Sequence, residues 1–176
     1  LTVREVEAYL NKLKKRGYEI LITKVHGEPS PESVNAVTDE FSAFQPGLIV
    51  AVGGGSVIDT GKAVAAMLPG RERVEEYLEG VGTKKPSGDK VPFVALPTTS
   101  GTGSEATMNA VISRKGPAGF KKSLRHPNYI PDAAVLDPEL LLSCPASVTA
   151  ACGMDAFSQL LESYLSAKAS PLSDIL

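Results

Sequence analysis

Hydrophobic residues follow two different spacings along this chain, and the two alternate. In some segments apolar residues recur every three or four positions, as on one side of a helix. In others they form short continuous runs, which are typical of strands buried on both faces. The helical spacing predicts a first helix that ends before Gly17. It predicts further helices over residues 31–44 and 56–68, and over most of the chain after residue 144. The apolar runs predict strands at residues 18–25, 47–52 and 91–97.

This alternating order predicts a parallel sheet with helices on both of its faces. After Pro97 the pattern changes to a loop rich in glycine, threonine and serine. Two short apolar segments around the turn "RKGPAG" then predict a hairpin appended to the sheet, and "DAAVLDPELL" predicts a short strand and a turn. From Ser143 onward the pattern is helical only. We therefore expect a Rossmann-like, doubly wound α/β domain over residues 1–143 and the beginning of an all-helical domain over residues 144–176.

The composition excludes several classes of protein. A formal net charge of -2 over 176 residues leaves no broad basic surface for nucleic acid or for an anionic membrane. The sequence shows no basic leader and no long apolar span, and Cys144 and Cys152 do not form a paired CxxC spacing. We therefore expect a reduced, cytoplasmic setting and a small molecule or another protein as partner. Because the chain starts at Leu1 inside a helical pattern, we also expect it to be a piece of a longer protein.

The stretch "AVGGGSVIDTGKA", residues 51–63, places three glycines between a predicted strand and a predicted helix. Backbone N–H groups at the start of a helix attract anions, and small residues there let a phosphate approach them. This predicts a ligand that carries phosphate. Neither standard fingerprint fits, because the phosphate-loop pattern needs glycine at Ser56 and the dinucleotide pattern needs glycine at Ile58. The alternative is a tight turn in which Ser56 caps the helix.

Glycines and hydroxyls also follow the next predicted strand, in "LPTTSGTGSEAT", residues 96–107. Gly101, Gly103 and Ala106 match the spacing of the dinucleotide fingerprint, but no clear helix follows, so we interpret that match as accidental. Open α/β sheets bind ligands in the crevice beyond the carboxyl ends of their strands. Both loops are therefore predicted to line one crevice.

Four stretches, "GGGSVIDTGKA", "PTTSGTGSEAT", "PDAAVLDPEL" and "GMDAFSQLLESYLS", resemble the iron-containing (group III) alcohol dehydrogenase family in their order and spacing. The resemblance implies the dehydroquinate synthase-like architecture of that family, with one more strand before Leu1 and further helices after Leu176. It implies NAD or NADP as cofactor, with contacts from Gly54, Gly55, Ser56, Asp59, Thr98, Thr99, Thr102, Val111 and Lys121. For Lys121 the alternative is an exposed strand lysine. Lys62 is interpreted as structural.

In "CGMDAFSQLLESYL" Asp155 and Gln159 lie four residues apart and so share one side of a helix. The resemblance implies that Asp155 is a ligand of a divalent metal, Fe2+ or else Zn2+. Gln159 stands where the family usually has a histidine ligand and is the second ligand that the resemblance implies, although an amide oxygen binds such metals more weakly than imidazole. The alternative is a solvated helix face, because apolar residues cover the opposite side. His26 and His126 fall at no ligand position, and we expect them in loops or on the surface.

The resemblance also implies an activity. A metal would hold the oxygen of a small primary alcohol or aldehyde while hydride passes between its carbon and the nicotinamide. We also expect a homo-oligomer, a dimer or higher. Two alternatives stay open. One is a metal-independent NAD(P)H reductase of the same fold, like the maleylacetate reductases, and the other is a truncated nucleotide-binding module without activity of its own.

Overall fold

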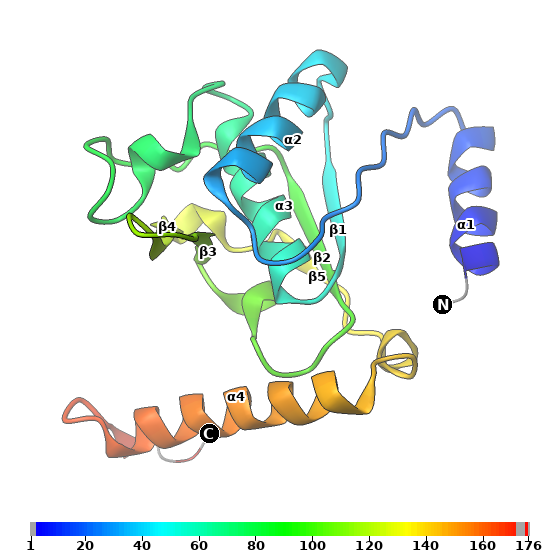
Figure 1. Ribbon diagram of the computed structural model, residues 1–176. Helices are drawn as coiled ribbons and strands as arrows, with labels where there is room; N and C mark the ends of the chain where they lie inside the picture. Colours follow the sequence, from blue (N-terminus) through cyan, green and yellow to red (C-terminus); the bar gives the residue numbers. More distant parts are fainter. Residues whose placement is uncertain (1–2, 172–174, 176) are drawn as a thin grey trace.

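The computed structural model describes residues 3–171 and 175, and its centre is a parallel sheet (Figure 1). The strand order is β1-β2-β5, with β1 (Ile49–Gly53), β2 (Phe93–Pro97) and β5 (Ala133–Ala134). Parallel neighbours need a crossover connection, because the chain must return to the starting edge of the sheet. Between β1 and β2 that connection contains the helix α3 (Gly55–Met67). The predicted α/β class with a parallel sheet is confirmed.

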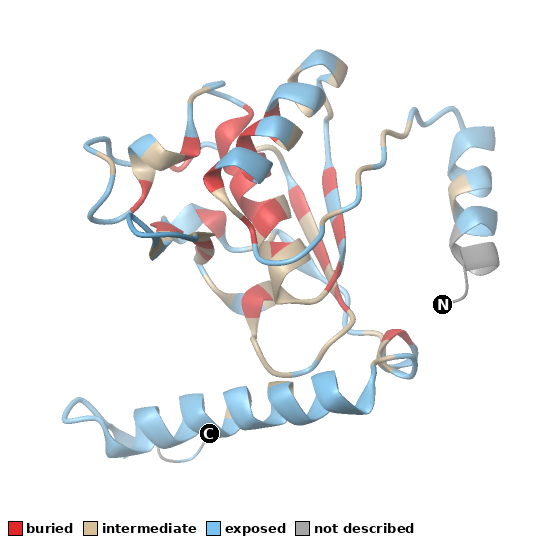
Figure 2. Ribbon diagram, viewed as in Figure 1, coloured by how far each residue is buried: buried red, intermediate tan, exposed pale blue. Residues whose placement is uncertain are grey.

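Helix α3 packs against both β1 and β2 at the centre of the fold, and it is mostly buried (Figure 2). Gly61 lets the helix lie directly on the sheet, because a Cβ at this position would be 2.8 Å from the ring of Phe93. Each large apolar side chain buried in such a core stabilises the fold by roughly 1.5–3 kcal/mol. The largest fully buried apolar side chains are Tyr129, Phe93, Ile58, Leu78, Ile112, Leu124, Val34, Val64 and Val74.

The helix α2 (Pro31–Phe44) has the start and the end that the sequence predicts. Ser30 and Ser33 form a capping box, in which each side-chain oxygen accepts the backbone N–H of the other residue, at 3.2 and 2.9 Å. Pro31 follows the cap, where its lack of an N–H costs nothing. Gln45 ends the helix in the left-handed region, with a φ of 53°. Local sequence chemistry alone thus sets both ends of α2.

The predicted strand over residues 18–25 is wrong. This segment has no regular secondary structure, and within the described residues no strand pairs with it. Its apolar run gave the signal, yet Ile22 is 58% exposed. An extended segment becomes a strand only when a neighbour accepts and donates its backbone hydrogen bonds. The run of apolar residues reports a preference for burial and does not supply that neighbour.

The predicted hairpin is confirmed, with β3 (Asn109–Arg114) and β4 (Phe120–Arg125) in antiparallel pairing. It does not extend the parallel sheet, however, but forms a two-stranded sheet of its own beside α3. Its buried residues Ala110, Ile112 and Leu124 belong to the core cluster around α3. The other short elements are the single turns η1 (Val74–Tyr77), η2 (Ser104–Ala106), η3 (Pro127–Tyr129) and η4 (Pro138–Leu141).

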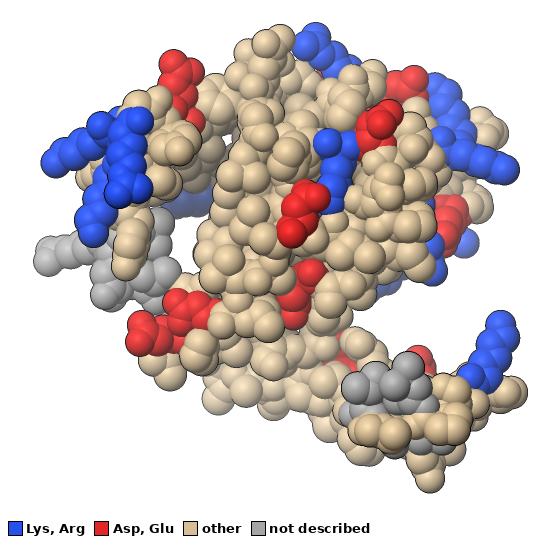
Figure 3. All heavy atoms as spheres, turned by 180° about the vertical axis from the view of Figure 1, so that it is seen from behind, with Lys and Arg blue, Asp and Glu red and all other residues tan. Residues whose placement is uncertain are grey.

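Two helices lie at the margins of the molecule, α1 (Val3–Lys15) and α4 (Ala146–Leu165) (Figure 1). In Figure 3 the basic side chains of α1 gather at one end of the face shown, and acidic and basic groups are interspersed elsewhere. No helix in the described part of the chain is long and apolar enough to cross a membrane. Helix α4 begins close to the expected boundary at Ser143, and the division into two domains there stays a prediction.

Candidate functional site

Two loops leave the carboxyl ends of neighbouring strands and start side by side. β1 pairs with β2 so that Gly53 lies opposite Pro97, and the N–H of Thr98 donates to the carbonyl oxygen of Gly53 at 3.0 Å. The glycine loop, residues 54–56, and the threonine loop, residues 98–103, therefore share one end of the sheet, as predicted.

The glycines of the first loop make room for threonines of the second. A Cβ at Gly54 would lie 3.3 Å from the Thr99 side chain, and one at Gly55 would lie 2.9 Å from Thr102. Because 2.9 Å is closer than carbon atoms pack, a side chain at Gly55 would displace the threonine loop. The sequence analysis explains these glycines by the approach of a phosphate. The structure shows a second reason for them, which is the close packing between the two loops.

The start of α3 lacks a side-chain cap. The residue that caps this helix is Gly54, which has no side chain to bond the N–H groups of the first turn. Ser56 lies inside the helix and does not cap it, so the alternative of a serine-capped turn is wrong. Uncapped N–H groups at the positive end of a helix favour a bound anion. With the neighbouring threonine hydroxyls as further donors, this end of the sheet fits the pyrophosphate of a dinucleotide.

Asp59 joins α3 to the hairpin rather than pointing away from the protein. One of its carboxylate oxygens accepts the N–H of Val111 at 3.0 Å, and the other accepts the hydroxyl of Ser104. Its side chain is only 14% exposed. Two residues that the family resemblance singles out, Asp59 and Val111, are thus in direct contact.

Lys62 lies one turn further along α3, and its side chain is only 1% exposed. Its ammonium donates to the carbonyl oxygens of Ser104 and Asn109, each at 2.7 Å, and to the hydroxyl of Thr107 at 3.1 Å. Burial lowers the pKa of Lys62 to about 8, and the charge of Asp59, 3.8 Å away, opposes that shift. Lys62 is therefore a residue of the protein interior, and its interpretation as structural stays a prediction.

Lys121 lies on the outer side of the hairpin, 65% exposed, and pairs with Glu28 at 3.4 Å. A hydrogen bond from the Ser113 hydroxyl, and then the charge of Lys121, lower the pKa of Glu28. The structure does not bring Lys121 to the two loops, so the alternative of an exposed strand lysine describes its present position.

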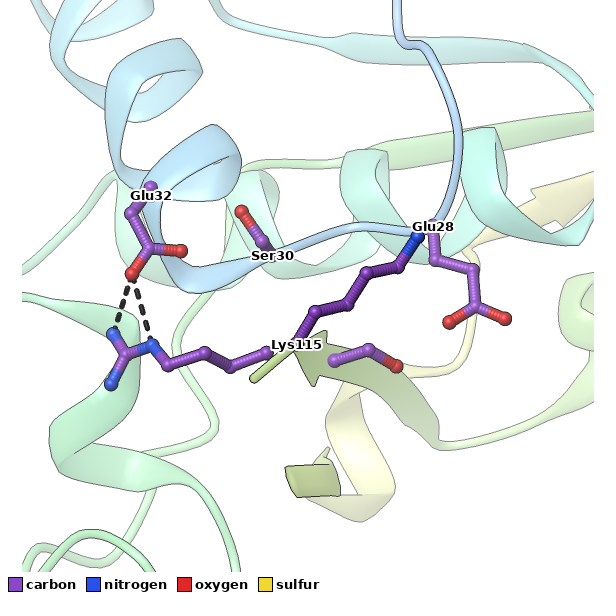
Figure 4. Close-up of a pocket in the computed structure, with 6 residues that line it drawn as sticks. Glu28, Ser30, Glu32 and Lys115 are labelled. Carbon is purple, nitrogen blue, oxygen red and sulfur yellow. Dashed lines mark hydrogen bonds and ion pairs between the residues drawn. The ribbon is translucent and has the colours of Figure 1, made fainter. Parts of the chain in front are cut away.

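An open cavity of about 390 Å³ lies beside the Lys121 pair, between the start of α2 and the end of β3. Figure 4 shows Glu32 and Glu28 on opposite sides of it, with the Lys115 side chain crossing toward Glu28. Arg114 bonds one oxygen of Glu32 through two nitrogens, at 2.7 and 3.0 Å. The acidic groups of this cavity are already matched by basic neighbours.

A second cavity, of about 290 Å³, opens directly beside the threonine loop. Its lining combines Val52 of β1 and two threonines that the sequence predicted with residues after β5 that it did not predict. The lining residues are Val52, Thr98, Thr99, Leu140, Ser143, Cys144, Pro145 and Val148. The sequence signalled only a short strand and a turn at "DAAVLDPELL", without the strand's neighbour. In the structure β5 is parallel to β2, so its carboxyl end points to the same edge of the sheet and brings the following residues near the threonine loop.

On α4 the amide of Gln159 donates to the carboxylate of Asp155 at 3.0 Å, and both residues are exposed. Nowhere in residues 3–171 do three or more His, Cys, Asp or Glu side chains gather as a metal site would require. Two oxygens on one helix are fewer than the ligands that a transition metal takes, so these residues alone do not complete a metal site. His26 and His126 lie outside the helices and strands, as expected.

Comparison with known proteins decides the family. Residues 2–138 match the family model described as iron-containing alcohol dehydrogenase. The chain belongs to this family. It is 35% identical over 170 residues to the long-chain-alcohol dehydrogenase 1 of Geobacillus thermodenitrificans, covering 96% of this chain and 42% of the relative. It is 34% identical over 169 residues to the NAD-dependent methanol dehydrogenase of Bacillus methanolicus, covering 96% and 43%.

Solved structures agree with this membership of the iron-containing alcohol dehydrogenase family. The sulfoacetaldehyde reductase of Bifidobacterium kashiwanohense, in complex with NAD+, has a TM-score of 0.81 and 33% identity, covering 89% of this chain and 41% of that one. A 1,3-propanediol oxidoreductase has a TM-score of 0.81 and 31% identity, covering 97% and 44%. The chain thus spans less than half the length of the relatives it matches. The family-model match includes both loops and the hairpin and ends before α4.

Proposed function

We propose that this chain is the nucleotide-binding part of an NAD(P)-dependent oxidoreductase that acts on a small primary alcohol or aldehyde. The observation that carries the proposal is the uncapped start of α3, packed against Thr99 and Thr102. A pyrophosphate suits this place because helix N–H groups and hydroxyls are donors and the helix end is positive. A relative whose structure holds NAD+ and one named as NAD-dependent support the choice of cofactor.

Each predicted cofactor residue has a role in this proposal. Backbone N–H groups of the glycine loop bind the pyrophosphate, and hydroxyls of the threonine loop complete its donors. Asp59 acts from inside by holding Val111 and Ser104 in place. Lys121 remains a proposed contact through its exposed ammonium. The residues that touch the cofactor are then Gly54, Gly55, Ser56, Thr98, Thr99, Thr102, Val111 and Lys121.

The cavity beside the threonine loop suits a flat ring of the same dinucleotide. Val52, Leu140 and Val148 give it apolar walls, and it opens next to Thr98 and Thr99. Binding sites for cofactors combine apolar walls with a few polar groups that fix orientation. The loops would hold the phosphates while this cavity excludes water from one ring.

The bound nicotinamide would exchange hydride with the carbon that carries the substrate oxygen. This chain contributes binding and orientation to that reaction. Asp155 is the proposed metal ligand and Gln159 its neighbour in an enzyme that uses Fe2+ or Zn2+. Because their two oxygens do not complete a site, no step of the proposal depends on the metal. We further propose a cytoplasmic setting and a homo-oligomeric assembly.

A pair of glycine variants tests the proposed binding site. Gly55→Ala places a Cβ 2.9 Å from Thr102, whereas Gly47→Ala places one with no atom within 4 Å. We expect Gly55→Ala to weaken NADH or NADPH binding about tenfold or more, and Gly47→Ala to leave it unchanged, as measured by calorimetry on this chain. The proposal fails if the unaltered chain binds neither dinucleotide, or if both variants bind equally well.

A metal-independent reductase is the second candidate, because Gln159 bonds Asp155 where a histidine ligand is expected. The test is NAD(P)H oxidation with short aldehydes by the longest natural form of the protein, before and after exhaustive chelation. Activity that survives chelation and an Asp155→Ala change would favour this candidate. Activity lost in both cases would favour metal-assisted transfer. Dinucleotide binding without any turnover would favour a binding module.

A further inference from the structure

The ammonium of Lys62 makes all its close hydrogen bonds to one segment outside its own helix. The acceptors at 2.7, 2.7 and 3.1 Å belong to Ser104, Asn109 and Thr107. A lysine ammonium has three N–H donors, so this segment supplies one acceptor for each of them. Residues 104–109 connect the threonine loop to the hairpin. Lys62 therefore ties α3 to the segment that directly follows the threonine loop.

A buried lysine at this position costs folding free energy. The neighbouring positions of α3 are buried and apolar, and an ammonium among them gives up its hydration. Desolvation is the largest cause of the lowered pKa, and Lys90 adds to it; the carboxylates of Asp59 and Glu105 act in the opposite direction. A methionine would fill the same volume without this cost. The cost is offset by the acceptors that the ammonium satisfies and by the nearby carboxylates.

The hydrogen bonds continue from Lys62 toward the proposed cofactor site. The carbonyl oxygen of Ser104 accepts a hydrogen bond from the ammonium, and the N–H of Ser104 donates to the hydroxyl of Thr102 at 3.4 Å. Thr102 in turn lies against Gly55 at the start of α3. Asp59 holds the same segment at the Ser104 hydroxyl and further along at Val111. The interior pair of Lys62 and Asp59 therefore fixes the base of the threonine loop.

We propose that Lys62 is a positioning residue for dinucleotide binding: its ammonium holds Ser104 to Asn109 so that Thr102 stays beside the uncapped start of α3. Lys62 itself does not touch the cofactor and acts through Ser104 and Thr102. The proposal rests on the dinucleotide site proposed above. The proposal adds a requirement for a charged, fully buried residue nearly two helical turns beyond the loop that binds the phosphates.

The first test compares Lys62→Met with a control substitution at another buried polar residue, on the helix α2. Asn35 is a buried polar residue of α2 that bonds Val74 and Glu75 and touches neither loop. We expect Lys62→Met to weaken NADH binding about tenfold, because three buried or part-buried acceptors lose their donor. Asn35→Ala should bind NADH as the unaltered chain does. Calorimetry on the full 176-residue chain measures both. Binding of NADH by Lys62→Met within twofold of the unaltered chain overturns the proposal.

The pH dependence of NADH affinity separates positioning from stability. A neutral amine has two N–H donors for three acceptors, so affinity is expected to fall as the pH rises above about 8, where Lys62 loses its proton. Loss of this buried charge makes the folded chain more stable, so affinity and stability should change in opposite directions. In Lys62→Met the affinity should vary less with pH. If affinity instead rises together with stability, or if Lys62→Met has the same pH profile, the proposal is wrong.

Amide hydrogen exchange gives a readout that does not depend on the cofactor. Lys62→Met should speed exchange over residues 98–109 and Asn35→Ala should not. If the unaltered chain binds no dinucleotide, the proposed function fails. Faster exchange in Lys62→Met that is confined to this loop then still supports the role of Lys62 in fixing the loop, and unchanged exchange overturns that role.

If Lys62→Met does not fold, a second variant tests the proposal: Thr107→Val removes one acceptor and keeps the lysine. Unchanged NADH affinity and loop exchange in Thr107→Val would overturn the proposal.

Discussion

Helices α3 and α4 are both rich in apolar residues, yet one is buried and the other is not. Figure 2 shows α3 largely buried at the centre and α4 exposed along its length. The apolar side of α4 is 43–63% exposed at Met154, Phe157, Leu160, Leu161 and Tyr164. The difference teaches that periodicity identifies the side of a helix that can be buried, while only a partner surface buries it.

The same difference divides the proposed site. The cofactor half lies between α3, the strand ends and the hairpin. There the two loops meet at Gly54 and Gly55, and Asp59 bonds Val111 of the hairpin. The proposed metal half lies on α4, where Asp155 and Gln159 contact each other. Gly101 links the two halves, because a Cβ there would lie 2.5 Å from the carbonyl oxygen of Cys152 on α4.

Two phenylalanines give the largest expected contrast. Phe93 is fully buried under α3, and Phe157 on α4 is 57% exposed. Phe93→Ala should lower the free energy of unfolding by about 3–5 kcal/mol, and Phe157→Ala should change it by no more than about 0.5 kcal/mol. Urea unfolding of this chain measures both. Equal losses would show that α4 is buried in solution and would break the comparison.

The pH dependence of stability gives the next largest effect. The pKa of Lys62 is about 8 in the folded chain and 10.5 as its ordinary value, so the unfolded chain holds the proton more tightly between these values. The free energy of unfolding should therefore rise between pH 8 and pH 10.5, by roughly 3 kcal/mol at most. Lys62→Met should lack this rise. If the free energy of unfolding changes with pH in the same way in the unaltered chain and in Lys62→Met across this range, the burial of a charged lysine in α3 is contradicted.

A pair of glycines tests the link between the two halves. Gly101→Ala should cost about 1–3 kcal/mol, because its Cβ meets the backbone of Cys152. Gly153 lies inside α4 with nothing within 4 Å of a Cβ, so Gly153→Ala should stabilise the chain by about 0.5–1 kcal/mol. Thermal unfolding distinguishes the two signs. A neutral Gly101→Ala would mean that the threonine loop and α4 are not in contact.

The smallest effect is expected at the outside of the hairpin. Arg114 and Glu32 form an exposed pair, 38% and 64% exposed, whereas Asp59 holds the hairpin from inside. A double-mutant cycle of Arg114→Ala and Glu32→Ala should give a coupling of about 0.2–1 kcal/mol that weakens as salt is added. Asp59→Asn should cost more than either single change. A stronger outer than inner connection would reverse this ranking.

Much of the fold could be predicted because its signals are local. The capping residues of α2 adjoin the helix they start, and apolar runs mark β1 and β2 to within a few residues. The site was predicted less completely. Leu140 and Val148 were missed, and the segment 18–25 was given a strand, because each depends on which strands become neighbours. Strand order is a property of the folded chain that residue spacing does not report.

The sequence by itself determined most of the elements and the positions of the two loops, because helix caps, glycines and apolar runs act over a few residues. Only the tertiary structure decided which groups meet. It placed Thr102 against Gly55, and it gave Lys62 acceptors more than 40 positions away. It also left α4 without a covering partner in the described residues. The physical reason is that hydrogen bonds to a buried charge, and close approaches at a glycine, depend on packing between elements that are distant along the chain.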